Sequence, residues 1–216
     1  MLGGAVASGC ASPSLQLLGS PFGKSANRHG NGGYSLSTDQ IEAIPYASIG
    51  VRIGGSAPVV MILASINGGN LHWASADRIV LITERGRLVK TIGMPRDLIG
   101  TRWTGSDALL STLHQQTGSG EAGVGRIIDL RPKDDFSVPV ESRYEWLGEE
   151  SLSLLGRERR TVLVAERVTV RKWRWKAENR YWFDADNGRL LKSRQQYCPE
   201  VPAITLEVLK PVADSV

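Results

Sequence analysis

Two tryptophans alternate with cationic residues in the stretch 171–176, which reads Arg-Lys-Trp-Arg-Trp-Lys. Indole rings stack on the apolar C–H faces of sugars, and guanidinium groups bind carboxylates through paired hydrogen bonds. Together with an aromatic run a few residues later, this composition suits the binding of an acidic polysaccharide. The candidate glycan-binding residues are Arg171, Trp173, Arg174, Trp175, Tyr181 and Trp182.

The strand that contains these tryptophans leaves two orientations open for them. Valines recur at alternate positions of residues 161–175, and mostly arginine and threonine fill the positions between them. Successive side chains of a strand point to opposite faces, so this pattern predicts a half-buried strand with a basic outer face. Trp173 and Trp175 have the parity of the arginines. Either they project from the basic face, or a β-bulge near Arg171 turns them into a barrel-like core.

Residue types used in catalysis are present, but their spacing matches no common catalytic or metal-binding arrangement. The histidines His29, His72 and His114 are far apart in the sequence, whereas zinc sites usually combine closely spaced ligands. The acidic pairs at 134–135 and 149–150 are adjacent residues, whose carboxylates would point to opposite faces of a strand. We therefore expect both pairs in solvated loops, and we expect no enzyme activity, no metal site and no cofactor.

Residues 118–123 match the glycine pattern G-x-G-x-x-G of dinucleotide-binding folds. In those folds the pattern follows a strand and opens a helix, which places the pyrophosphate at the helix N-terminus. Here it follows a predicted helix at 109–113 and precedes a predicted strand at 124–130, so we expect a loop without a nucleotide. The net charge of +4 does not require nucleic acid either, and we expect no such partner.

The N-terminus carries a pattern that predicts covalent modification. Residues 7–10, Ala-Ser-Gly-Cys, match the lipobox, in which small residues precede a cysteine that receives a diacylglycerol. Ala7 stands where Leu is usual and no basic segment precedes it, so we interpret residues 1–9 as a truncated lipoprotein signal peptide. Ala11 replaces the Asp that would favour retention in the inner membrane. We therefore expect Cys10 to carry the lipid and the lipid to anchor the chain in the outer membrane.

Two other interpretations of Cys10 stay open. It could form a disulfide with Cys198, the second of two cysteines, or belong to an ordinary disordered terminus. If Cys10 is acylated, Cys198 is a lone thiol, which we expect to be buried and inert. Residues 10–33 are rich in Ser, Gly, Asn and Pro, which predicts a flexible tether between the lipid and the folded part.

Residues 34–216 have the pattern of a β-rich domain with one or two short helices. The 216-residue chain is 41% hydrophobic, which is enough for a substantial core, and its 24 glycines recur between apolar runs. Ser37 and Gln40 predict a capping box that opens a helix ending before Pro45. A second helix is predicted around residues 109–113.

The remaining apolar segments predict short antiparallel strands, arranged as a curved sheet, a sandwich or a barrel-like sheet. Glycine-containing turns at 67–70, 84–86 and 186–188 predict hairpins. The continuous apolar run at 59–66 predicts a strand buried on both faces. The candidate strands cover residues 46–53, 59–66, 71–75, 78–83, 87–91, 126–130, 143–147, 161–175, 179–183, 189–196 and 203–209.

Several separated blocks of the sequence also suggest a family. These are residues 43–49 (AIPYASI), 59–63 (VVMIL) with 71–77 (LHWASAD), 86–91 (GRLVKT) with 93–95 (GMP), and 181–184 (YWFD) with 188–193 (GRLLKS). Together they resemble the YjbF/GfcB family, the group 4 capsule polysaccharide lipoproteins of Gram-negative bacteria. The resemblance extends from about residue 37 to about residue 207.

This resemblance implies an outer-membrane lipoprotein that faces the periplasm. It implies two kinds of partner, a periplasmic protein and an outer-membrane β-barrel of a polysaccharide secretion system, and it brings no catalytic residue. We therefore expect a non-catalytic accessory of capsule or exopolysaccharide secretion, tethered beside an export barrel. The domain would then act in one of two ways, either by holding an acidic glycan on the basic aromatic region or by docking another protein on the surface of its sheet. The alternative is a periplasmic carrier of lipid or lipid-linked glycan, since the apolar runs at 59–66 and 162–170 would allow an apolar pocket.

Overall fold

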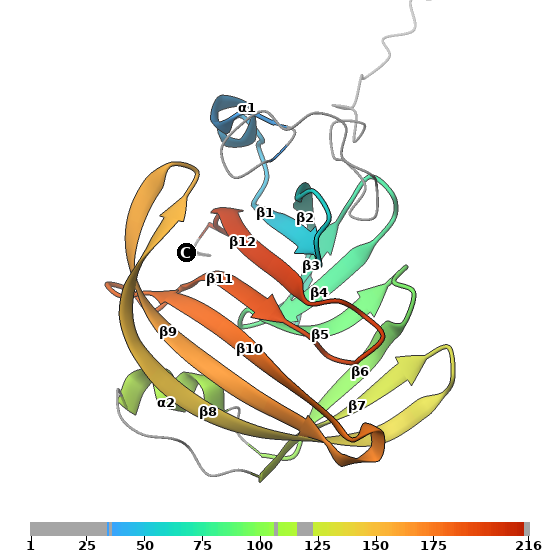
Figure 1. Cartoon of the computed structure of the whole chain (residues 1–216). Helices are drawn as coiled ribbons and strands as arrows, with labels where there is room; N and C mark the ends of the chain where they lie inside the picture. Colours follow the sequence, from blue (N-terminus) through green and yellow to red (C-terminus); the bar gives the residue numbers. More distant parts are fainter. Residues whose placement is uncertain (1–33, 35, 106–107, 116–122, 214–216) are drawn as a thin grey trace, which may run out of the picture.

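A single twelve-stranded antiparallel sheet curls into a nearly closed barrel in the computed structural model (Figure 1). The structure describes residues 34, 36–105, 108–115 and 123–213. The strand order is β5-β4-β3-β2-β1-β12-β11-β10-β9-β8-β7-β6, so nearly all paired strands are also consecutive in the sequence. This arrangement confirms the mainly β, barrel-like class that the sequence predicts, with hairpin connections as the main way of building the sheet.

The strands differ greatly in length. The first six are β1 (Ser48–Ile53), β2 (Val59–Asn67), β3 (Asn70–Ala74), β4 (Val80–Glu84), β5 (Arg87–Ile92) and β6 (Asp97–Trp103). The last six are β7 (Gly123–Arg131), β8 (Asp135–Leu154), β9 (Arg157–Val170), β10 (Trp175–Asp184), β11 (Leu190–Gln195) and β12 (Ile204–Lys210). The long β8–β9 hairpin curves along one side of the barrel (Figure 1).

Strands β5 and β6, at the two ends of the strand order, meet through side chains. The Thr101 hydroxyl donates to the Val89 carbonyl over 2.9 Å, and the Leu98 amide donates to the Thr91 hydroxyl over the same distance. The Thr91 hydroxyl in turn donates to Asp97. These bonds bring the two ends together where the described chain shows no backbone ladder between β5 and β6.

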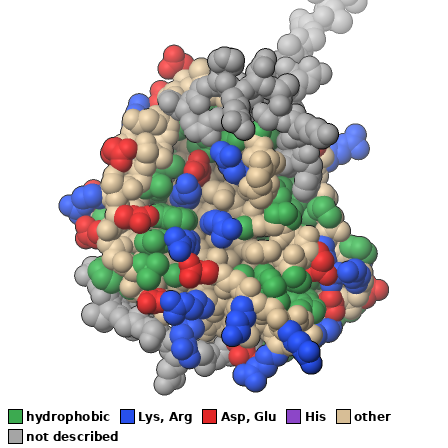
Figure 2. All heavy atoms as spheres, in the orientation of Figure 1, with side chains coloured by type: hydrophobic (Ala, Val, Ile, Leu, Met, Phe, Trp, Pro, Cys, Tyr) green, Lys and Arg blue, Asp and Glu red, His purple; other side chains and the backbone are tan. Residues whose placement is uncertain are grey.

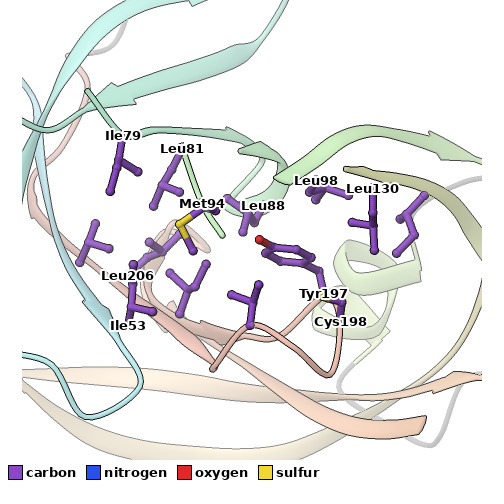
Figure 3. Close-up of a cluster of buried hydrophobic side chains, with 14 of the residues drawn as sticks. Ile53, Ile79, Leu81, Leu88, Met94, Leu98, Leu130, Tyr197, Cys198 and Leu206 are labelled. Atoms are coloured by element: carbon purple, nitrogen blue, oxygen red, sulfur yellow. The ribbon is translucent and has the colours of Figure 1, made fainter. Parts of the chain in front are cut away.

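The main hydrophobic core fills the inside of the curled sheet (Figure 3). Its side chains come from β1 to β9 and β12, and from the segment after β11 that contains Tyr197 and Cys198. Leu81, Leu130 and Ile204 have no exposed surface. Because alternate residues of each strand face inward, the apolar alternation predicted from the sequence becomes the lining of this interior.

Both predicted helices are present. Helix α1 (Thr38–Glu42) begins at Ser37, whose hydroxyl accepts from the Gln40 amide, while the Gln40 side chain accepts from the Ser37 amide. This is the predicted capping box. Helix α2 (Ala108–Gln115) lies near β8 and β9 and contains His114. None of the helices in the described part is long and apolar enough to cross a membrane.

Some strand predictions were wrong in extent. Strand β2 is fully buried only at its start, and Ile66 near its end is 53% exposed, because this end lies in the hairpin tip formed by residues 67–70. Strand β6 was not predicted, because its polar and glycine residues obscure the alternation. The acidic pair at 149–150 lies within β8 and not in a loop, although both side chains are exposed.

Candidate binding cleft

The predicted strand 161–175 is in fact two strands that reverse direction between the two tryptophans. A single 3-10 turn, η3 (Arg171–Trp173), follows β9, and Arg174 adopts a left-handed conformation with φ of 50°. Trp175 then starts β10 and pairs with Val170, a buried residue of the main core. A tight turn, and not a β-bulge, therefore sets the direction of these side chains.

The turn orients both tryptophans toward the core. Trp173 and Trp175 are half-buried, pack against the main hydrophobic cluster, and contact each other edge to face with ring centroids 6.4 Å apart. Arg171 and Arg174 are exposed, and Arg171 donates to Glu141 over 2.5 and 3.2 Å. Of the two orientations open from the sequence, the structure shows the core-facing one, with part of each ring accessible.

The other two candidate aromatic residues lie elsewhere on β10. Tyr181 has no exposed surface and points into a polar cluster inside the barrel. Trp182, on the opposite face, is 9% exposed; its ring N–H donates to Glu150, and Lys192 lies over the ring. The four aromatic side chains therefore do not form one continuous exposed surface.

The polar cluster around Tyr181 is centred on Glu166 of β9. This carboxylate is fully buried and forms ion pairs with Arg87, at 2.8 Å, and with Arg126. It also accepts hydrogen bonds from four neutral side chains, which come from β8 and β10. They are Ser142 (2.7 Å), Tyr144 (3.2 Å), Asn179 (3.0 Å) and Tyr181 (2.9 Å).

Electrostatics keeps Glu166 ionised. Burial is the largest single influence and by itself would raise its pKa, but the charges of Arg126 and Arg87 and the hydrogen bond from Ser142 outweigh it. The pKa of Glu166 is therefore held well below its usual value. Six side chains bind this carboxylate at once, which fits a structural role in joining β5, β7, β8, β9 and β10.

Sequence reasoning overlooked this cluster, although one signal was present. Glu166 has the same parity as Val162, Val164, Val168 and Val170, so it is a charged residue on the inward face of β9. An ionised side chain in such a position requires buried partners. The partners themselves could not be identified, because Arg87 and Arg126 are remote in the sequence and only the curled sheet brings them close.

A cleft of about 660 Å³ opens beside the end of β12. It lies between the tip of the β8–β9 hairpin, the β10–β11 turn, the β4–β5 turn and the end of β12. Ligand pockets in proteins usually have volumes of about 300–1,000 Å³. Its apolar lining includes Leu71, Trp73, Leu154, Leu155, Leu190, Leu191, Leu206, Val208, Leu209, Pro211 and Val212.

Charged side chains border this apolar lining. Arg85, Arg157, Arg159 and Arg189 line the cleft together with two acidic residues, Glu42 and Asp184. On the face in Figure 2, hydrophobic side chains and Lys or Arg side chains lie next to one another. The cleft thus combines an aliphatic floor with a cationic rim, which suits a ligand that has both apolar and anionic parts.

The part of the chain that the structure describes contains no group of three His, Cys, Asp or Glu side chains able to hold a metal ion.

Cys198 is buried and unbonded, and burial raises its thiol pKa to about 11, which suppresses the reactive thiolate. Cys10 and residues 118–122 of the glycine pattern lie outside the described residues, and Gly123 begins β7, so lipidation and the loop stay predictions.

Comparison with known proteins identifies the family. A crystal structure of the hypothetical lipoprotein YmcC from Escherichia coli K12 superposes with a TM-score of 0.71 and 27% identity, covering 81% of this chain and 89% of that one. In sequence, the uncharacterized lipoprotein GfcB of E. coli K12 is 27% identical over 82% of each chain. The uncharacterized lipoprotein YjbF of that strain is 27% identical over 77% of this chain and 76% of its own. The model of the family "Group 4 capsule polysaccharide lipoprotein gfcB, YjbF" matches residues 25–209, and the chain belongs to this family.

Proposed function

We propose that this chain is a non-catalytic accessory of capsule or exopolysaccharide secretion, and that the arginine-rimmed cleft is its binding site. Family membership supports the link to capsule polysaccharide and to a lipid anchor. The observation that carries the proposal is the cleft itself, a recess of ligand size bordered by cations. The charged groups inside the barrel are engaged with one another, which supports binding over catalysis.

In this proposal the anchor determines where the domain acts. A lipid on Cys10 holds the domain at the periplasmic face of the outer membrane, beside an export β-barrel and a periplasmic partner of the secretion system. Each buried methylene of an acyl chain contributes roughly 0.8 kcal/mol, so several chains anchor firmly. Confinement raises the effective concentration of the domain near the barrel without any new contact.

The basic turn between β9 and β10 is a proposed contact for the acidic polysaccharide itself. Arg171 and Arg174 are exposed there, and parts of the Trp173 and Trp175 rings are accessible. Separate Trp173→Ala and Trp175→Ala variants should weaken binding of an acidic polysaccharide several-fold, and Trp182→Ala serves as a control for the loss of a packed indole. Unchanged affinity in both variants would remove this turn from the proposal.

Secretion in cells tests the function as a whole. A strain that lacks this chain should release much less surface polysaccharide, and the wild-type chain should restore the release. A Cys10→Ser chain, made in equal amount, should restore little because it lacks the anchor. Normal release from the deletion strain would contradict the proposed function.

A further inference from the structure

The floor of the cleft is aliphatic and partly exposed. Leu190 and Leu191 on β11, Val208 and Leu209 on β12, and Val212 beyond β12 are half-buried side chains that line the same recess. The aromatic residue Trp73 also lines it but is only 4% exposed, so its ring face is not offered to a ligand. Sugar rings bind best on exposed aromatic faces, whereas an aliphatic floor favours a hydrocarbon chain.

The β4–β5 turn lies close to β11 at the cleft. Gly86 has φ of +83°, and a Cβ atom there would overlap the side chain of Leu190 across the barrel. The glycine therefore lets the turn approach β11 closely. Arg85, the preceding residue, is thereby placed at the cleft together with Leu190.

The acidic residues at the rim are already engaged, whereas two of the arginines are not. Glu42 pairs with Arg157 at 2.9 Å. The Asp184 carboxylate accepts hydrogen bonds from two backbone amides of its own turn, at 3.0 and 3.2 Å. Arg85 and Arg159 make no ion pair with any side chain in the described part of the protein. The rim therefore has guanidinium groups available for an anion.

We propose that the cleft binds an anionic amphiphile, with a hydrocarbon chain on the leucine and valine floor and a phosphate group on Arg85 and Arg159. Guanidinium groups bind phosphate through two parallel hydrogen bonds, so the rim would fix the head group while the floor holds the chain. This assignment rests on the proposed function for its biological ligand. A phospholipid and a lipid-linked saccharide share the required chemistry.

Three small ligands separate the contribution of the phosphate group to binding from that of the hydrocarbon chain. The full chain with Cys10→Ser, which removes the anchor's own acyl chains, is titrated with dodecyl phosphate below its micelle concentration, with dodecanol and with inorganic phosphate. Dodecyl phosphate should bind at least tenfold more tightly than either of the others. Arg85→Glu combined with Arg159→Glu should weaken the binding of dodecyl phosphate at least tenfold. Leu191→Asp, which places a charge on the aliphatic floor, should also weaken it at least tenfold.

A matched control uses two other exposed arginines. Arg143 and Arg194 do not line the cleft and make no ion pair in the described residues, so Arg143→Glu with Arg194→Glu makes the same charge change away from it. This variant should bind dodecyl phosphate like the wild type. Equal affinity in both double variants, or no binding of dodecyl phosphate by a folded wild-type chain, would overturn the proposal.

Native mass spectrometry of the wild-type chain purified from membranes distinguishes a bound phospholipid from a bound lipid-linked saccharide. Added mass of a phospholipid or of a lipid-linked saccharide, lost in the Arg85→Glu, Arg159→Glu variant, supports the proposal and identifies which amphiphile is carried. Failure of the dodecyl phosphate experiment while secretion still depends on the chain would reject this ligand class alone. Normal secretion without the chain would reject the proposed function instead.

Discussion

Arg87 and Glu166 form a buried ion pair of 2.8 Å between strands β5 and β9, which stand far apart in the strand order. They meet because the sheet curls and brings β5 beside β6 at the other end of the strand order, so that both side chains point into one interior. Arg87 is also held by the Tyr181 hydroxyl, and its guanidinium lies 5.1 Å from the Trp103 ring centroid. The pair therefore depends on closure of the barrel, and the stability of variants that lack it tests that closure.

Replacing Glu166 should destabilise the barrel strongly. Glu166→Gln leaves Arg87 and Arg126 buried beside each other without their shared carboxylate. Loss of one partner from a buried ion pair usually costs about 3–5 kcal/mol. Urea denaturation should show this loss in the free energy of unfolding. Glu178→Gln, at a partly exposed carboxylate that pairs with Arg180, should cost less than about 1 kcal/mol, and an equally small effect at Glu166 would contradict the structural role of the cluster.

The pH dependence of stability should follow the same carboxylate. The pKa of Glu166 is lowered in the folded state, so its contribution is complete above its unfolded pKa of about 4.3 and is lost as pH falls toward the folded value. Wild-type stability should therefore fall below about pH 4.3. In Glu166→Gln this fall should be smaller, as measured by thermal unfolding between pH 3 and 7. Identical pH profiles would show that other carboxylates dominate.

Tyr34, the first residue that the structure describes, packs on Gly50. The Tyr34 hydroxyl donates to Glu207 over 2.5 Å, and a Cβ atom on Gly50 would overlap that hydroxyl. Gly50→Ala should displace Tyr34 and cost about 1–3 kcal/mol in chemical denaturation, with faster proteolysis near Tyr34. Gly55→Ala, where a Cβ meets open space, is the control. In a Tyr34→Ala background the Gly50 substitution should cost much less, and full additivity would contradict this packing.

Cys198 should behave as an inert thiol in the folded protein. Burial raises its pKa from 9.0 to about 11, so the thiolate fraction at pH 8 falls by roughly 100-fold. In the Cys10→Ser chain, Cys198 is the sole thiol, and iodoacetamide should label it only after unfolding in urea. Rapid labelling of the native protein at pH 8 would show that the site opens or that the thiol is accessible.

Local signals in the sequence were enough to predict most of the strands and turns, but not β6, the reversal between β9 and β10, or how far the strands extend. The turns at 67–70, 84–86 and 186–188 and the Ser37 capping box depend on neighbouring residues, and all appear in the structure. Strand β8 runs for 20 residues, and only its middle was predicted. Its pattern is interrupted at Gly148, where φ is +106° and the register with β9 shifts, so its regular alternation is lost.

Features that depend on tertiary structure were beyond sequence reasoning. The alternation of β9 left the orientation of Trp173 and Trp175 open, because a one-residue change in the turn reverses the face. The cleft combines residues from β3, β11, β12 and three separate turns. Its rim arginines, such as Arg85 and Arg159, are ordinary surface residues in the sequence, and only the curled sheet brings them to one recess.

The most direct test of the account is polysaccharide release by a strain in which the Arg85→Glu, Arg159→Glu chain replaces the wild type. The Arg143→Glu, Arg194→Glu chain is the control, and both must reach wild-type amounts in the membrane. We predict that the cleft variant releases as little polysaccharide as the deletion strain, while the control variant releases wild-type amounts. Wild-type release by the cleft variant would contradict the claim that this cleft is the functional site.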